Sequence, residues 1–160
     1  MARSKPVSLL KAAEIAGMPL VSKTHALNPQ AVRDSRSLSA VTGLTALGFQ
    51  LVTLQPGRLA WEYHRHLYEE QCFYILAGQG HADIDGVLHA LGPGDFLGFA
   101  AQGAAHTLIN TGTEPLVFIA ARTHLELDVC DYPRLGKRLY MNGGEEALVD
   151  LTAVSQPGVL

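Results

Sequence analysis

The chain has 160 residues, which suits one domain with a sizeable core. Hydrophobic residues make up 48% and charged residues 17%, a balance that excludes a disordered chain. The formal net charge of -3 provides no broad attraction for nucleic acid or an anionic membrane, so we expect neither as a partner. No apolar run reaches the roughly 20 residues that span a bilayer.

The first expected element is a helix over residues 8–17, with Ser8 as its N-cap and Gly17 as its stop. Lys11 and Glu14 interrupt the apolar residues here, so we do not interpret this segment as a signal peptide. The two cysteines, Cys72 and Cys130, have no CxxC spacing and suit reduced thiols that fill the core. A single disulfide between them is the alternative. We therefore expect a cytoplasmic protein.

Strand-like segments separated by turn residues follow from about residue 48. Asp85-Gly86 predicts a two-residue hairpin, because both residues tolerate the positive φ of a type I′ turn. Roughly seven short strands at this spacing predict an all-β, antiparallel sandwich or barrel. The expected strands cover residues 50–54, 59–66, 72–84, 87–91, 95–100, 106–110 and 116–124.

The remaining segments are polar, glycine-rich or irregular. We interpret residues 1–47 as an N-terminal arm, residues 48–124 as the barrel and residues 125–160 as a C-terminal arm. Both arms are expected to pack on the barrel rather than to form separate domains.

The stretch HRHLYEEQ, residues 64–71, carries the first candidate ligands. Side chains two apart on a strand point to the same face, so His64 and His66 can converge on one metal ion. A bare HxH pair is not specific, and it needs further ligands before it indicates a metal site.

Two segments of the chain resemble the motifs of the cupin superfamily. The first is PGRLAWEYHRHLYEEQCFYILAGQG, and the second is LGPGDFLGFAAQGAAHTLIN, which contains Pro93, Gly94, His106 and Asn110. The resemblance covers about the central half of the chain. It implies a double-stranded β-helix, a jelly-roll barrel, that holds one divalent metal through His64, His66, His106 and one oxygen donor.

The oxygen donor departs from the family pattern. The acidic ligand of the family lies seven positions before the closing glycine, and counting back from Gly78 gives Gln71. A register in which Glu70 were the ligand would move Phe73 off the barrel face. We therefore favour Gln71, with Glu70 as the alternative and Glu69 third.

Three imidazoles and an amide are all neutral, so they leave the double charge of the ion uncompensated. Such a site should bind its metal more weakly than one with a carboxylate, yet polarise a bound oxygen or attract an anion more strongly. Nitrogen-rich ligation suits Zn, Ni, Fe or Cu, and Mn stays open.

Strand parity places Glu62 beside the ligand histidines, as a general base or as a hydrogen-bonding partner of a ligand. Trp61 and Tyr63 have the opposite parity and are expected to pack against an arm or a partner subunit. Further candidates are Phe73 and Phe99, which would line the barrel and contact a substrate, and Arg122 and His124, which could meet an anionic substrate if they point inward.

Three functions fit these residues. The first is an isomerase or lyase that uses a divalent metal as a Lewis acid on a sugar, a sugar phosphate, or a keto or hydroxy acid. The second is an iron- or copper-dependent dioxygenase. The third is a non-catalytic small-molecule-binding protein, because one fold hosts many functions. We favour the first, and we expect a homodimer from the resemblance and from the apolar residues of the arms.

Overall fold

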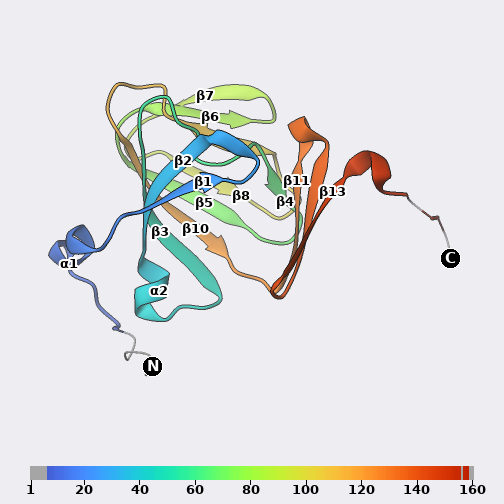
Figure 1. The fold of residues 1–160 in the computed structure, drawn as a ribbon. Helices are drawn as coiled ribbons and strands as arrows, with labels where there is room; N and C mark the ends of the chain where they lie inside the picture. Colours follow the sequence, from blue (N-terminus) through green and yellow to red (C-terminus); the bar gives the residue numbers. More distant parts are fainter. Residues whose placement is uncertain (1–6, 156, 159–160) are drawn as a thin grey trace.

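The computed structural model describes residues 7–155 and 157–158 and forms an antiparallel β-barrel (Figure 1). The six-stranded sheet has the order β1 (Val21–His25), β2 (Asn28–Ser37), β3 (Leu47–Leu54), β10 (Leu116–Thr123), β5 (Gln71–Ala77) and β8 (Phe96–Phe99). The three-stranded sheet has the order β7 (Val87–Leu91), β6 (Gly80–Ile84) and β9 (His106–Ile109). The four-stranded sheet has the order β13 (Glu145–Asp150), β12 (Lys137–Asn142), β11 (Leu127–Tyr132) and β4 (Arg65–His66). The predicted all-β architecture is confirmed.

Glycine and turn geometry divide the central strands. Residues 72–84, expected as one strand, form β5 and β6, because the chain turns at Gly78 with φ +80. A Cβ at Gly78 would lie 2.3 Å from the carbonyl oxygen of Pro115, so only glycine fits this approach. The expected hairpin is confirmed at Asp85 and Gly86, whose φ values are 48° and 83°.

The predicted helix is shorter than expected at its start. The helix α1 spans Ala12–Gly17, and its N-cap is Lys11 rather than Ser8. The backbone N–H of Lys11 donates to the Glu14 carboxylate at 2.6 Å, so Glu14 satisfies a donor at the point where the helix begins. The end at Gly17 agrees with the prediction.

The segments expected to be irregular contain regular structure. Residues 18–47 form β1, β2 and a second helix, α2 (Leu38–Thr42), and residues 125–160 include β11, β12, β13 and the 3-10 turns Pro133–Leu135 and Leu151–Ala153. Their strands pair with the barrel, β2 with β3 and β11 with β4. Apart from β11, these strands are largely exposed or part-buried, so a search for apolar alternation does not find them. The boundary between barrel and arms stays a prediction.

The core lies between the sheets and sets the side-chain parity of β5. Phe73, Ile75, Phe118, Leu54 and Leu108 are fully buried in one apolar cluster. Along β5, Gln71, Phe73 and Ile75 are buried while Tyr74 and Leu76 are exposed. Gln71 therefore points to the same side as the core residues of its strand.

The segment 59–66, expected as one strand, is regular only at Arg65–His66. Leu59 and His64 form isolated bridges, and the residues between them are turns and bends. Strand parity therefore does not extend from His64 back to Trp61 and Glu62.

The buried side chain of Asn110 links separate parts of the chain through hydrogen bonds to backbone groups. Its Nδ2 donates to the carbonyl oxygens of Leu54 at 2.7 Å and Glu114 at 2.9 Å, and its Oδ1 accepts from the Gly112 N–H at 2.9 Å. The residue is fully buried.

We expect Asn110→Ala to lower the free energy of unfolding by about 3 kcal/mol, because it leaves buried backbone groups without partners. Urea denaturation measures this change. Asn142→Ala, at an exposed position of β12, is the matched control and should change stability by less than about 0.5 kcal/mol. Equal effects of the two variants would contradict a structural role for Asn110.

Candidate metal centre and cavity

Three histidines and a glutamine from separate segments meet inside the barrel. His64 precedes β4, His66 lies in β4, Gln71 begins β5 and His106 begins β9; all four are buried. The ring centroid of His64 lies 5.0 Å from that of His66 and 4.8 Å from that of His106. His64 and His106 also exchange two backbone hydrogen bonds, at 3.1 and 2.8 Å. The four residues predicted as ligands are thus brought together.

The hydrogen bonds of two rings fix where their protons lie. The Nδ1 atom of His64 donates to the carbonyl oxygen of Glu62 at 2.7 Å, and that of His106 donates to the carbonyl oxygen of Ala104 at 3.1 Å. A carbonyl oxygen only accepts, so each neutral ring carries its hydrogen on Nδ1 and a lone pair on Nε2. Both Nε2 atoms face Oε1 of Gln71, at 3.3 and 3.0 Å.

His66 is oriented by a carboxylate instead of a carbonyl group. Its Nδ1 donates to Oδ2 of Asp128 at 2.5 Å, and its Nε2 lies 3.1 Å from Nε2 of Gln71. Asp128 belongs to β11, which pairs with β4 through Cys130 and His66. The C-terminal strands therefore hold one of the candidate ligands in place.

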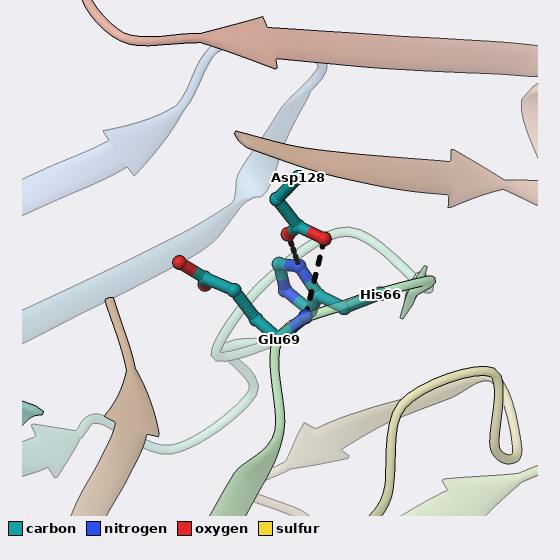
Figure 2. Close-up of side chains that lie close together, drawn as sticks. All are labelled: His66, Glu69 and Asp128. Carbon is teal, nitrogen blue, oxygen red and sulfur yellow. Dashed lines mark hydrogen bonds and ion pairs between the residues drawn. The ribbon is translucent and has the colours of Figure 1, made fainter. Parts of the chain in front are cut away.

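A second group of possible ligands shares His66 (Figure 2). Ligand atoms of His66, Glu69 and Asp128 lie within 4.8 Å of one another, and all three residues are buried, so this triad could hold a metal ion. Oδ1 of Asp128 accepts from the backbone N–H groups of Tyr68 at 3.1 Å and Glu69 at 3.2 Å. The Glu69 carboxylate accepts from the Leu125 N–H at 2.9 Å and from Arg122 at 3.3 Å.

Burial keeps two of the rings neutral. Burial, followed by the charges of His106 and His66, lowers the pKa of His64 well below its ordinary value. Burial lowers the pKa of His106 to about 4. Burial acts to raise the pKa of Asp128, but the hydrogen bond and charge of His66, together with backbone hydrogen bonds, outweigh burial and hold that pKa below the ordinary range. Neutral imidazoles are the form that binds metals.

Aromatic side chains pack around the cluster. Phe99 stacks on His106 with ring centroids 3.5 Å apart, and Phe73 lies 5.8 Å from the same ring. Trp61 packs on Phe73 at 5.3 Å and on Phe118 at 6.1 Å, so it does not have the strand parity expected for it, because the chain around it is not a continuous strand. The predicted contact with an arm is present, since the guanidinium of Arg33 from the N-terminal arm lies 5.0 Å from the Trp61 ring centroid. Tyr63 does contact the C-terminal segment, since the guanidinium of Arg134 lies 3.8 Å above its ring.

A cavity of about 260 Å³ opens beside His64, His66 and Gln71. Trp61, Phe73 and Tyr132 form part of its wall. The basic side chains of its wall are Lys23, His25, Arg33 and Arg122, and none of the residues that line it is an aspartate or a glutamate. The cavity is therefore electropositive.

The other predicted site residues lie in different places. Arg122 lines the cavity, whereas His124 is exposed and does not. Glu62 is buried, accepts from Nδ2 of Asn28 at 2.6 Å and does not line the cavity. Phe99 contacts His106 but lies outside the cavity wall, and Glu70 is exposed.

Sequence reasoning missed Asp128 and the three N-terminal cavity residues Lys23, His25 and Arg33. They lie in the segments expected to be irregular, where no motif marks them. Alternation in LDVCDY, residues 127–132, was a usable signal for β11. Both cysteines are free, and burial raises the pKa of Cys130 to about 12. No helix among the described residues is long and apolar enough to cross a membrane.

Comparisons with known proteins agree with this fold. The model of the cupin domain family matches residues 50–122. A solved structure from Acidithiobacillus ferrooxidans, named "Putative sugar phosphate isomerase", is 42% identical with a TM-score of 0.93, over 94% of this chain and 97% of that one. A search of curated proteins found no match.

Two further solved structures are more distant. A sugar phosphate isomerase of the cupin superfamily from Silicibacter pomeroyi is 22% identical with a TM-score of 0.75, over 84% of this chain and 87% of that one, and it supports the fold alone. A "predicted oxalate decarboxylase" from Thermotoga maritima is 27% identical with a TM-score of 0.52, over 59% of this chain and 82% of that one. The family model and the near full-length similarity to the Acidithiobacillus ferrooxidans protein together show that this chain belongs to the cupin superfamily.

Proposed function

We propose that this cupin is a metal-dependent isomerase of a small phosphorylated sugar, with His64, His66, Gln71 and His106 as ligands of one divalent transition metal. The metal site is supported by three hydrogen-bond acceptor atoms that face one another without a donor between them. The Nε2 lone pairs of His64 and His106 face Oε1 of Gln71 at 3.3 and 3.0 Å, with no hydrogen to share. A cation at the centre removes this repulsion and gives all these atoms a partner.

The donor chemistry favours this cluster over the His66–Glu69–Asp128 triad. The carboxylate oxygens of the triad already accept hydrogen bonds from N–H groups, and the Glu69 carboxylate also pairs with Arg122 at 3.3 Å. Asp128 then acts as the partner that fixes the His66 tautomer and raises the basicity of its Nε2. The two arrangements share His66 but differ in their other ligands, so they make different predictions.

Three imidazoles and an amide suit Zn, Ni, Fe or Cu better than Ca or Mg, and Mn is the remaining alternative. A metal bound there would supply Lewis-acid polarisation of a carbonyl or hydroxyl oxygen of the ligand. Trp61 and Phe73 would cover the apolar face of a sugar, since both line the cavity beside the histidines. Arg122 lies at the same wall and could contact the ligand, although its Nη1 already pairs with the Glu69 carboxylate.

The substrate class is supported by similarity and by electrostatics. The Acidithiobacillus ferrooxidans relative, 42% identical over 94% of this chain, carries the name of a sugar phosphate isomerase. The cavity adds basic side chains without a lining carboxylate, which favours an anionic ligand. A general-base role for Glu62, a homodimer and a cytoplasmic location stay predictions.

We expect His64→Ala and His106→Ala to lose at least about tenfold of the metal that the purified wild-type protein retains, because each removes a ligand. Asp128→Asn should weaken metal affinity about 10- to 100-fold through His66, and Glu69→Gln should leave it near the wild-type value. Metal content is measured by plasma mass spectrometry. His89→Ala, at an exposed position of β7, is the control.

The same variants separate the alternatives. If the triad held the ion, Glu69→Gln would release it and His106→Ala would not. If the cluster held no metal, the Gln71 amide would be turned over and donate to both rings. The wild-type protein would then carry no ion, and His106→Ala would change stability alone.

We expect isomerase activity to depend on the bound metal. Protein stripped with a chelator should interconvert no aldose and ketose phosphates, and one divalent transition metal should restore at least about 90% of the wild-type rate. Proton NMR of a panel of pentose and hexose phosphates under argon measures the conversion. Turnover that needs oxygen and consumes it would instead support the dioxygenase, and inertness across the panel would contradict the isomerase.

A further inference from the structure

The cavity wall includes residues that precede the barrel matched by the cupin model. That match begins at residue 50, whereas Lys23 and His25 lie in β1 and Arg33 lies in β2. The hairpin β1–β2 joins the six-stranded sheet through β3 (Figure 1). Its basic side chains therefore line the same cavity as the candidate metal ligands, although they come from a segment outside the matched domain.

The hairpin places two like charges directly opposite each other. Lys23 and Arg33 are cross-strand partners in the β1–β2 pairing, and both line the cavity. Like charges at directly opposed positions destabilise a sheet. None of the ion pairs formed within residues 7–155 and 157–158 includes either side chain. The fold thus maintains an uncompensated positive pair at the cavity.

Arg33 is held in place and keeps an unused donor. Its Nη1 donates to the carbonyl oxygen of Ala60 at 3.1 Å, and its guanidinium lies 5.0 Å from the centroid of the Trp61 ring. Its Nε is buried and has no hydrogen-bond partner. Burial, and then the charge of Arg122, lowers the pKa of Arg33. The Arg33 guanidinium is thus oriented by the protein without a carboxylate partner.

Arg122 is a weaker candidate to supply that anion contact. Its Nη1 already pairs with the Glu69 carboxylate at 3.3 Å, which compensates its charge. The cavity therefore has one neutralised arginine and two cations without counter-ions. The Lys23–Arg33 pair is therefore the part of the cavity wall best able to bind an anionic group of a ligand.

We propose that Lys23 and Arg33 of the β1–β2 hairpin form a phosphate-binding subsite that anchors the phosphoryl group of the ligand. The subsite depends on the proposed function only for the identity of the sugar that carries the phosphate. Guanidinium and ammonium groups bind phosphate oxygens through charge-assisted hydrogen bonds. With the phosphate held at the hairpin, the rest of a small sugar would lie in the cavity that His64, His66 and Gln71 also line.

The subsite gives the hairpin a role in specificity. The binding energy of a non-reacting phosphate can orient the reacting carbons at the proposed metal site. A sugar without phosphate would leave Lys23 and Arg33 uncompensated and would bind poorly.

The test is calorimetric titration of the full chain, loaded with the metal that it retains, using three probes. These are inorganic phosphate, a hexose 6-phosphate and the same hexose without phosphate. We expect the phosphorylated sugar to bind at least about tenfold more tightly than the free sugar. Arg33→Gln should remove most of that difference, and Lys23→Gln should weaken both phosphate probes about threefold or more.

Controls separate the subsite from folding and from the metal. Arg58→Gln removes an arginine outside the cavity and should bind all probes as wild type does. Lys23 is exposed, so Lys23→Gln should fold even if Arg33→Gln does not, and thermal melting checks both. Arg33→Lys keeps the charge but loses the planar fork, so it should bind phosphate with an intermediate affinity.

Phosphate binding in Arg33→Gln and Lys23→Gln equal to that of wild type would overturn the subsite. So would a metal-loaded wild-type protein that binds neither phosphate probe. Metal content, measured on the same samples, keeps the two proposals apart. Protein without metal whose phosphate affinity still depends on Arg33 would refute the metal site and support the subsite.

Discussion

The arrangement of the site depends on one repeated contact, the hydrogen bond from a ring Nδ1 to the carbonyl oxygen two residues earlier. His64 makes it to Glu62, and His106 makes it to Ala104. Each bond uses a backbone oxygen whose position follows from local chain geometry, and each fixes the tautomer of its ring. Because the two histidines also pair through their backbones, the two lone pairs are aimed inward as a unit.

The third ring is oriented from a distance in sequence. Asp128 lies 62 residues after His66 and reaches it because β11 pairs with β4. The same carboxylate accepts from the backbone of Tyr68 and Glu69, which fixes the loop that leads into β5 and Gln71. The C-terminal strands are thus part of the site, since removing them would release both His66 and the loop.

Much of the site could be predicted from the sequence, because its ligands lie in short motifs with local constraints. Alternation along β5 correctly put Gln71 on the side of Phe73 and Ile75. Parity failed at Trp61, because turns and bends interrupt the chain before His64. Asp128, Lys23 and Arg33 could not be found in this way. Their relation to the site comes from strand pairing between distant segments, which no local pattern encodes.

The charges of the cavity connect the two proposals. A divalent ion held by neutral donors keeps its full charge, and Lys23 and Arg33 add positive charge to the same enclosed space. These cations repel one another, so the cavity that contains only the metal is electrostatically unfavourable. A phosphorylated sugar bound as proposed would relieve this repulsion at both ends, with its phosphate at the hairpin and its oxygens toward the ion. Metal and anionic ligand should therefore bind cooperatively, because the positive charge of the ion and the negative charge of the ligand compensate each other in the cavity.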